Sequence, residues 1–320
     1  MDVKKLNLEL YLMIYLIRRC EEKIISIYPT DDMKTPMHMS MGEEAIAAGV
    51  CYALRKEDQI FGSYRSHAIY LAKSRDTDDF FAEMYGKDTA LLKGKGGSMH
   101  MSAAHHGFMG TSGIVASVIP IAVGAAFANK ALRNNKYAAV FFGDGATNEG
   151  VFWESLNVAS LMKLPIIFVC EDNDLAVHTP KSERDGYKSL CDIVSKFNCL
   201  VIKEKSTDVE VIYRTIQKGL KLMQQKEMPL FIHVSYYRYL EHVGINEDFN
   251  AGYRSKKEFL KWFMKDPVKI QRKKLIEIGL SEKEVQDAER KIEAKIDASI
   301  LKAQKAAFCE KSELYRGVLA

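Results

Sequence analysis

The stretch Tyr137–Leu175 reads YAAVFFGDGATNEGVFWESLNVASLMKLPIIFVCEDNDL, and its pattern decides the fold. Two short runs, 137–142 and 166–170, are apolar at every position, and residues 148–163 between them have the pattern of a helix. Strands that are apolar throughout are typical of a parallel sheet covered on both faces. We therefore predict an α/β fold with a mostly parallel sheet and helices on both of its faces.

Polar residues follow both strands of this unit. Gly143, Asp144 and Gly145 follow the first strand, Asn173 follows the second, and 173 − 144 = 29 residues separate Asp144 from Asn173. This interval suits one strand–helix–strand unit, so the two loops should lie side by side at the carboxyl edge of the sheet. The glycines let a phosphate approach the backbone and the free N–H groups of the following helix. Asp144, Asn173 and the carbonyl of Leu175 suit one Mg²⁺. Taken alone, the turn fits a tight turn with a capping aspartate equally well.

The remaining segments are predicted to be mainly helical. Residues 93–113 contain six glycines, which predicts an irregular loop that approaches a ligand. We expect helices at 6–28, 42–54, 114–132 and 209–224, and a further buried strand at 230–236. The charge-rich segment 255–306 is also expected to be helical, with a capping box at Ser281.

Composition narrows the class of protein. With 320 residues, 47% of them hydrophobic, the chain can bury a large core. Its 46 basic and 42 acidic side chains are too balanced to indicate nucleic-acid binding. The six cysteines form no CxxC pair, and the apolar N-terminal run is interrupted by Glu9, as in an amphipathic helix. We expect a cytoplasmic protein with no nucleic-acid or membrane partner.

Several further motifs carry a resemblance to a known family. They are HMSMGEEA at 38–45, SYRSH at 63–67, KGKGGSMHM at 93–101 and SGIV at 112–115. Together with the two loops above, and in the same order over nearly the whole chain, they resemble the alpha subunit of the first, thiamine diphosphate-dependent component of 2-oxo acid dehydrogenase complexes. That family includes the pyruvate, branched-chain and acetoin enzymes. The resemblance implies a thiamine diphosphate-binding fold and a 2-oxo acid or acetoin dehydrogenase/decarboxylase.

The resemblance also assigns roles to particular residues. It implies that Tyr64 and Arg65 contact the cofactor's diphosphate, that Gly145 and Ala146 lie near it, and that Gly113 and Val115 surround the aminopyrimidine ring. It also implies that Asp144, Asn173 and Leu175 bind Mg²⁺. Arg238 and His242 are implied to bind the cofactor from a later loop, with His242 as the catalytic residue. Arginines suit a diphosphate because they form charge-assisted hydrogen bonds with it, and a histidine can move protons near neutral pH. Each residue taken alone also fits a purely structural role.

The domain organisation follows from the same resemblance. We predict a single domain over 1–320, with a helical N-terminal segment at 1–57, a cofactor-binding α/β core at 58–240, and a loop and helical C-terminal segment at 241–320. Because this family carries the glutamate that activates the cofactor on a separate beta subunit, we expect two alpha and two beta chains. The expected substrate is a small 2-oxo acid, and a lipoylated acyltransferase is a further candidate partner.

The later loop departs from the family pattern. The family's RxxGHS reads here Arg238-Tyr-Leu-Glu-His-Val243, so Glu241 replaces a glycine and Val243 replaces a phosphorylated serine. We expect Glu241 to raise the pKa of His242 or to repel an anionic acyl acceptor. Asp172 also replaces an asparagine beside the predicted metal ligand. Three alternatives stay open: transfer to a non-lipoyl acceptor such as a keto-sugar, a catalytically silent alpha-like subunit, and a phosphate-binding enzyme without thiamine.

Five other histidines have less certain roles. His67 and His100 lie inside family motifs, where each either contacts substrate or orders the glycine-rich loop. We expect His105 and His106 to face solvent. His178 follows the predicted metal loop, and contact with substrate and simple exposure are equally compatible with its position.

Overall fold

The computed structural model describes residues 2–317 and contains one six-stranded sheet in which every neighbouring pair is parallel. The order is β2-β1-β3-β4-β8-β7, and a separate two-stranded hairpin, β5-β6, follows β4. The bounds are β1 Gln59–Ser63, β2 Phe108–Ser112, β3 Ala138–Gly143, β4 Ile166–Asp172, β5 Leu175–Ala176, β6 Thr179–Pro180, β7 Leu200–Glu204 and β8 Leu230–Ser235. The prediction of a parallel α/β sheet is confirmed.

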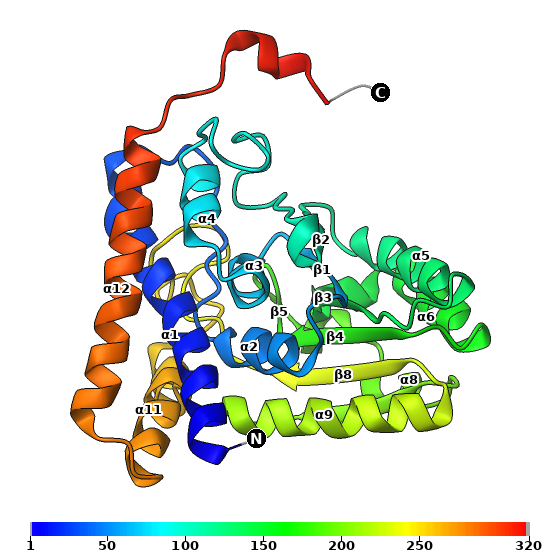
Figure 1. Cartoon of the computed structure of the whole chain (residues 1–320). Helices are drawn as coiled ribbons and strands as arrows, with labels where there is room; N and C mark the ends of the chain where they lie inside the picture. The colour runs from blue at the N-terminus through cyan, green and yellow to red at the C-terminus, as the bar shows by residue number, and fades with distance from the viewer. Residues whose placement is uncertain (1, 318–320) are drawn as a thin grey trace.

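Helices cover both faces of the sheet, as Figure 1 shows. On one side of the sheet lie α1 Val3–Ile27, α2 Glu44–Ala53, α3 His67–Ser74, α4 Thr77–Met84, α9 Val209–Lys226, α11 Pro267–Glu277 and α12 Glu282–Lys305, of which α1, α11 and α12 pack mainly on the other helices. The other side packs against α5 Val118–Ala131, α6 Gly150–Leu161 and α8 Leu190–Val194. Two short helices, α7 Lys181–Arg184 and α10 Lys256–Phe263, lie in the connections. The long helices α1 and α12 run side by side along one flank of the molecule (Figure 1).

Side chains of the central strands alternate between these two layers. On β3, Ala139 and Phe141 enter the first hydrophobic cluster, whereas Val140 and Phe142 enter the second. Both sets of positions are fully buried, which is why the strand reads as an uninterrupted apolar run. The parallel register pairs Gly143 with Glu171, so β3 and β4 end at the same level.

Several predicted elements differ in extent from those observed. The strand β2 lies within 93–113, where the sequence predicts irregular structure, because pairing with β1 draws this part of the glycine-rich stretch into the sheet. The helix predicted at 114–132 begins only at Val118, after Ala116 adopts a positive φ of 62°. The segment 255–306 forms three helices, and the capping box at Ser281 is confirmed at the start of the last one.

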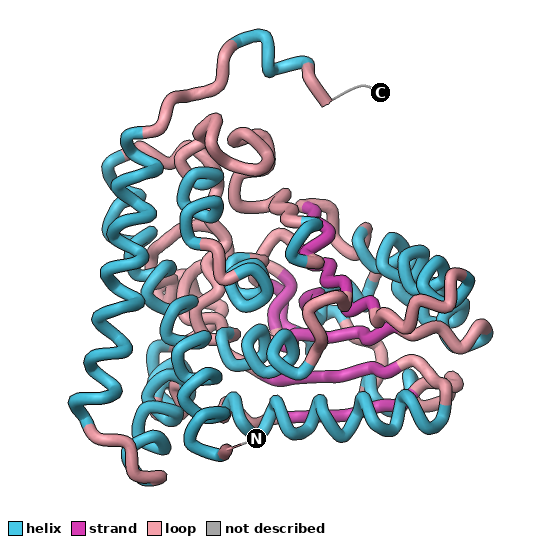
Figure 2. The backbone as a smooth tube through the Cα atoms, in the orientation of Figure 1, coloured by secondary structure: helices cyan, strands magenta, loops and turns pink. Residues whose placement is uncertain are grey.

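Loops gather on one side of the sheet, at the carboxyl ends of its strands, and Figure 2 shows how much of the chain they occupy there. One of these loops is the segment 236–255, which connects β8 to α10 and contains no helix or strand. No helix within residues 2–317 is long and apolar enough to cross a membrane.

Candidate active site

A cavity of about 430 Å³ opens at the carboxyl edge of the sheet. It is lined by the loops that follow β1, β3, β4 and β8, together with the start of α5. Eight of the residues predicted from the sequence line it: Tyr64, Arg65, Val115, Gly145, Ala146, Asn173, Leu175 and His242. Asp144 lies against an adjoining cavity, whereas Gly113 and Arg238 line neither. The parallel register thus brings together residues more than 170 positions apart in the chain, such as Arg65 and His242.

Asp144 is buried at the end of β3 with one oxygen left over. Its Oδ2 pairs with the guanidinium of Arg184 from α7, and its Oδ1 has no hydrogen-bond partner. Burial raises the pKa of Asp144 to about 7, and the nearby Asp172 adds to this effect. Because an unpaired buried acceptor is costly, the free oxygen suits a bound cation.

Asn173 and Leu175 are held in place by hydrogen bonds in the loop after β4, next to the loop that carries Asp144. The Asn173 side chain donates from Nδ2 to the Tyr236 hydroxyl at 2.9 Å and accepts at Oδ1 from the Leu175 N–H at 3.0 Å. The Asn173 amide oxygen keeps a second lone pair, so one carboxylate, one amide and one carbonyl are available for a hard cation such as Mg²⁺. This donor set fits the predicted metal. Within residues 2–317, no cluster of three or more His, Cys, Asp or Glu side chains could hold a metal ion.

Gly145 lies where a side chain would collide with the hairpin after β4. A Cβ on Gly145 would come within 2.9 Å of the Ala176 Cβ, whereas one on Gly143 would meet nothing within 4 Å. The loop after β3 therefore packs closely on the β5–β6 hairpin while its amides remain near the cavity. This backbone cradle suits a phosphate group.

Arg65 is a buried cation that lines the cavity. Its Nη1 donates to the Met39 carbonyl at 2.8 Å and its Nη2 to the His242 carbonyl at 3.0 Å, and the residue is 7% exposed. Two buried carboxyl groups, Glu43 and Glu171, also line the cavity. Burial raises the pKa of Glu43 to about 8, and burial together with Glu43 raises the pKa of Glu171.

The sequence motifs contained both glutamates without marking them as part of the site. Glu43 lies in HMSMGEEA, and Glu171 lies in β4, two residues before Asn173. The signal that could have identified Glu171 is its position directly after the apolar run 166–170. A charged residue that is buried there needs a partner or must stay neutral, which is typical of a functional site.

His242 has its ring held by two arginines. Its Nδ1 lies 3.4 Å from Arg65 Nη2 and 3.4 Å from Arg238 Nη1. Guanidinium groups only donate, so Nδ1 accepts and the proton of the neutral ring is on Nε2. Burial, then Arg65 and Arg238, lowers the pKa of His242 to about 3. The rings of His38 and Tyr64 lie edge-on to it at 5.4 and 5.7 Å between centroids.

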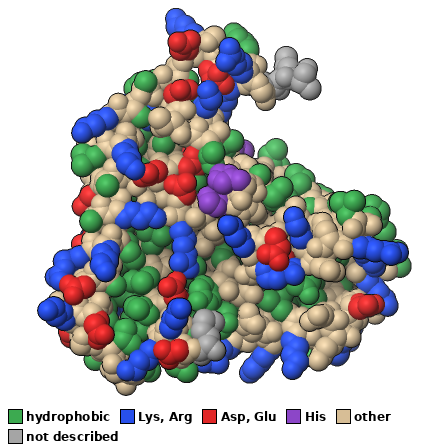
Figure 3. Space-filling view, in the orientation of Figure 1, with side chains coloured by type: hydrophobic (Ala, Val, Ile, Leu, Met, Phe, Trp, Pro, Cys, Tyr) green, Lys and Arg blue, Asp and Glu red, His purple; other side chains and the backbone are tan. Residues whose placement is uncertain are grey.

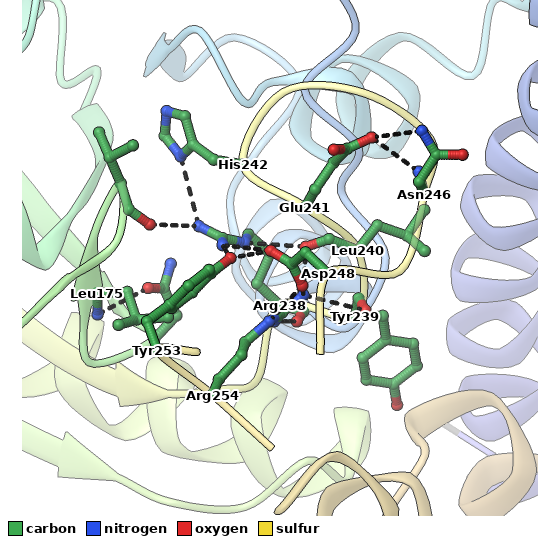
Figure 4. Close-up of polar contacts among 12 residues, drawn as sticks. Leu175, Arg238, Tyr239, Leu240, Glu241, His242, Asn246, Asp248, Tyr253 and Arg254 are labelled. Atoms are coloured by element: carbon green, nitrogen blue, oxygen red, sulfur yellow. Dashed lines mark hydrogen bonds and ion pairs between the residues drawn. The ribbon is translucent and has the colours of Figure 1, made fainter. Parts of the chain in front are cut away.

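Arg238 stabilises the loop that carries His242, as Figure 4 shows. It donates to the Leu240 carbonyl at 3.0 Å, to the Val177 carbonyl at 3.2 Å and to the Tyr253 hydroxyl at 2.8 Å. Arg254 donates to the Leu240 carbonyl at 2.8 Å and to Asp248 at 2.6 Å. Direct contact of Arg238 with a diphosphate stays a prediction; its observed contacts hold the loop in place.

Glu241 points away from His242, which corrects the expectation that it would raise the pKa of that histidine. Its Oε1 accepts from the backbone N–H and from the side-chain amide of Asn246, each at 2.9 Å (Figure 4). The carboxylate therefore closes a turn within the loop. The pKa of His242 is lowered, and Glu241 is not among its causes.

The glycine-rich loop is held by an internal carboxylate. Glu83 accepts from the backbone N–H groups of Gly94, Gly96 and Gly97 at 3.1, 2.8 and 2.8 Å. The amides that we expected to approach a ligand are thus occupied by Glu83. Gly113 lies at the end of this stretch, where a Cβ would be 3.5 Å from the His100 ring.

The other histidines lie outside the cavity. His67 is buried between Glu21 and Ser98, at 2.7 Å from each, and so orders the glycine-rich loop. His105 and His106 precede β2 at the opposite edge of the sheet; His105 is exposed and His106 is half-buried. The exposed His178 contacts the ring of Tyr253 at 4.5 Å between centroids.

Comparison with known proteins agrees with this geometry. The family model of the dehydrogenase E1 component matches residues 13–311, so the chain belongs to that family. It is 30% identical to the alpha subunit of the pyruvate dehydrogenase E1 component of Rickettsia bellii, over 98% of this chain and 95% of that protein. It is 32% identical to the corresponding subunit of Zymomonas mobilis, over 98% and 88%, and 33% identical to the alpha subunit of the acetoin:2,6-dichlorophenolindophenol oxidoreductase of Bacillus subtilis, over 73% and 70%.

Family membership defines the class of enzyme. The chain is an alpha subunit of a thiamine diphosphate-dependent oxidoreductase of the 2-oxo acid dehydrogenase type.

The low pKa of His242 gives a spectroscopic prediction. In the chain without cofactor, His242 should stay neutral from pH 5 to pH 8, because its charged form would face two guanidinium groups in a buried site. ¹H–¹⁵N spectra of its imidazole, assigned by loss of the signal in His242→Gln, should show an unprotonated Nδ1 throughout this range. The exposed His105, whose signal should be lost in His105→Ala and kept in His242→Gln, provides the control for the assignment. Titration of His242 between pH 6 and 7 would contradict this description of the site.

Proposed function

We propose that this chain binds thiamine diphosphate and Mg²⁺ in the cavity at the carboxyl edge of the sheet and forms the cofactor-binding half of an enzyme that acts on a small 2-oxo acid or on acetoin. The observation that carries the proposal is the buried, unpartnered Oδ1 of Asp144, which lies between Gly143 and Gly145, two residues that line the same cavity as Arg65. Thiamine diphosphate, when bound, supplies the electron sink for cleavage next to the carbonyl group.

The residues of this chain would bind the cofactor and the metal and would stabilise charge on the substrate. Asp144, Asn173 and the Leu175 carbonyl would hold the metal, and Arg65 would face the diphosphate with charge-assisted hydrogen bonds. His242 would donate a hydrogen bond from Nε2, since both arginines occupy its Nδ1 side. Its neutral ring suits the stabilisation of negative charge on a carbonyl oxygen.

The exposed face of α5 and α6 supports the proposal of a second chain. On α5, the exposed positions Ile121, Gly124, Ala128 and Ala131 follow helical spacing and carry no polar side chain. Figure 3 shows hydrophobic side chains gathered on the part of the surface formed by these two helices. Apolar patches of this kind mark interaction sites. We propose that a beta subunit that carries the cofactor-activating glutamate covers this face, in an assembly of two alpha and two beta chains.

The acyl acceptor stays open between two candidates. A lipoylated acyltransferase is the acceptor that family membership favours, and a small molecule such as a keto-sugar was suggested by Glu241. The observed contacts weaken the second argument, because Glu241 faces Asn246 rather than His242. Cytoplasmic localisation stays part of the proposal.

The activity can be tested with an artificial electron acceptor. The chain co-purified with its beta-type partner, thiamine diphosphate and Mg²⁺ should reduce 2,6-dichlorophenolindophenol with acetoin or with one member of a panel of 2-oxo acids. His242→Ala should lower kcat by about a hundredfold or more, the usual range for loss of a proton-transfer group. His105→Ala, at the opposite edge of the sheet, should leave kcat unchanged. Full activity in His242→Ala would contradict the role of His242 and favour a catalytically silent chain.

The predicted assembly can be tested on its own. Phe127→Glu places a charge on the apolar face of α5, where Phe127 is 49% exposed. We expect this variant to elute as a free chain in size-exclusion chromatography with light scattering, whereas the unchanged chain elutes with its partner. Leu222→Glu on α9, where the residue is 41% exposed, is the matched control and should assemble normally. Normal assembly of Phe127→Glu would exclude this face as the interface.

A further inference from the structure

A second cavity, of about 370 Å³, lies behind the loop that carries Asp144. It opens at the carboxyl ends of β4, β8 and β7, on the face of the sheet that packs against α6 and α8. Ligands in open α/β sheets bind at this edge. Of the residues to which the proposed function assigns a role, only Asp144 lines this cavity.

The strand register explains why this cavity is polar. On β8, the inward face reads Phe231, His233 and Ser235 toward the carboxyl end. The neighbouring β7 pairs Val201 with Phe231 and Lys203 with His233. This face of the sheet is therefore apolar at Phe231 and Val201. It carries basic side chains at His233 and Lys203, and a hydroxyl at Ser235, toward the carboxyl end.

On the other side of β8, the same levels are occupied by residues of β4. There, Phe168 pairs with Phe231, Cys170 with His233, and Asp172 with Ser235. The lining is completed by Lys205 just after β7, by Lys181 on α7 and by the segment 187–191.

The acidic residues of the cavity already have partners. Asp172 pairs with Lys181 and, at 2.8 Å, with His233 Nε2. Asp144 and Asp185 both pair with Arg184. These three carboxylates share two cations, Lys181 and Arg184, so at most one negative charge is left to offset the remaining lysines of the cavity.

Three lysines around the cavity have no such partner. Within residues 2–317, Lys188, Lys203 and Lys205 form no ion pair, although all three line the cavity and are exposed. In addition, His233 is 5% exposed, lines the cavity and has a buried Nδ1 without any hydrogen-bond partner. Because Nε2 lies against the Asp172 carboxylate, Nδ1 of a neutral His233 is an acceptor, and a water or a ligand hydroxyl is the kind of group that would satisfy it.

We propose that this cavity is a binding site for a small anion that carries a phosphate group. Lys188, Lys203 and Lys205 would supply the positive charge, and Ser235 and Tyr187 would supply hydroxyl donors. The volume is at the lower end of the range for small-molecule sites, which suits a ligand between inorganic phosphate and a sugar phosphate in size. It shares no lining residue with the cavity that holds Arg65 and His242, and the loop that carries Asp144 lies between the two cavities.

Calorimetric titration of the co-purified complex tests this proposal. The probes are inorganic phosphate, glucose 6-phosphate and, as the neutral comparison, glucose. We expect both phosphates to bind and glucose not to bind. Tighter binding of glucose 6-phosphate would identify a phosphate ester as the ligand, and equal binding would identify free phosphate.

Variants locate the binding. In Lys203→Ala/Lys205→Ala, the dissociation constant for phosphate should rise at least tenfold, which corresponds to 1.4 kcal/mol. Lys218→Ala/Lys221→Ala removes two exposed lysines from α9 and should change it by less than twofold. Absence of phosphate binding to the unchanged complex overturns the proposal. Equal affinity in Lys203→Ala/Lys205→Ala also overturns it, because phosphate then binds elsewhere, for example beside Arg65.

Discussion

The parallel pairing of β3 with β4 is the constraint on which the rest of the structure depends. Its register places Gly143 opposite Glu171, so the residues that follow, Asp144 and Asn173, leave the sheet at one level. A shift of one residue would move Phe141 and Phe142 into the opposite hydrophobic clusters and would disrupt the close packing on both faces of the sheet. The position of the predicted metal ligands is therefore fixed by core packing.

Charge burial shapes the site around this edge. Arg65 and Arg238 converge on His242, and the buried acids Glu43 and Glu171 lie in the same cavity as Arg65. Taking such groups out of water is costly unless they are paired or neutral. The raised pKa values of the two glutamates and the lowered pKa of His242 both follow from this cost. An anionic cofactor would relieve the excess positive charge next to His242.

Much of this arrangement could be predicted from the sequence, because it depends on local patterns. The uninterrupted apolar runs predicted β3 and β4. The spacing of Asp144 and Asn173 predicted that these two residues lie at the same edge of the sheet. The contacts of Glu241 and Glu83 could not be predicted. Glu241 turns toward Asn246, and Glu83 occupies the amides of the glycine-rich loop. Both depend on the path of a loop, for which neither apolar periodicity nor residue type gives a signal.

We propose that the free oxygen of Asp144 holds a cation that binds thiamine diphosphate. Calorimetric titration of the co-purified complex with thiamine diphosphate, with and without Mg²⁺, tests it most directly. We predict Mg²⁺-dependent binding that Asp144→Asn weakens at least a hundredfold, whereas Asp185→Asn, which alters the other carboxylate paired with Arg184, retains it. Unchanged affinity in Asp144→Asn, or binding that is independent of Mg²⁺, would contradict this account of the site.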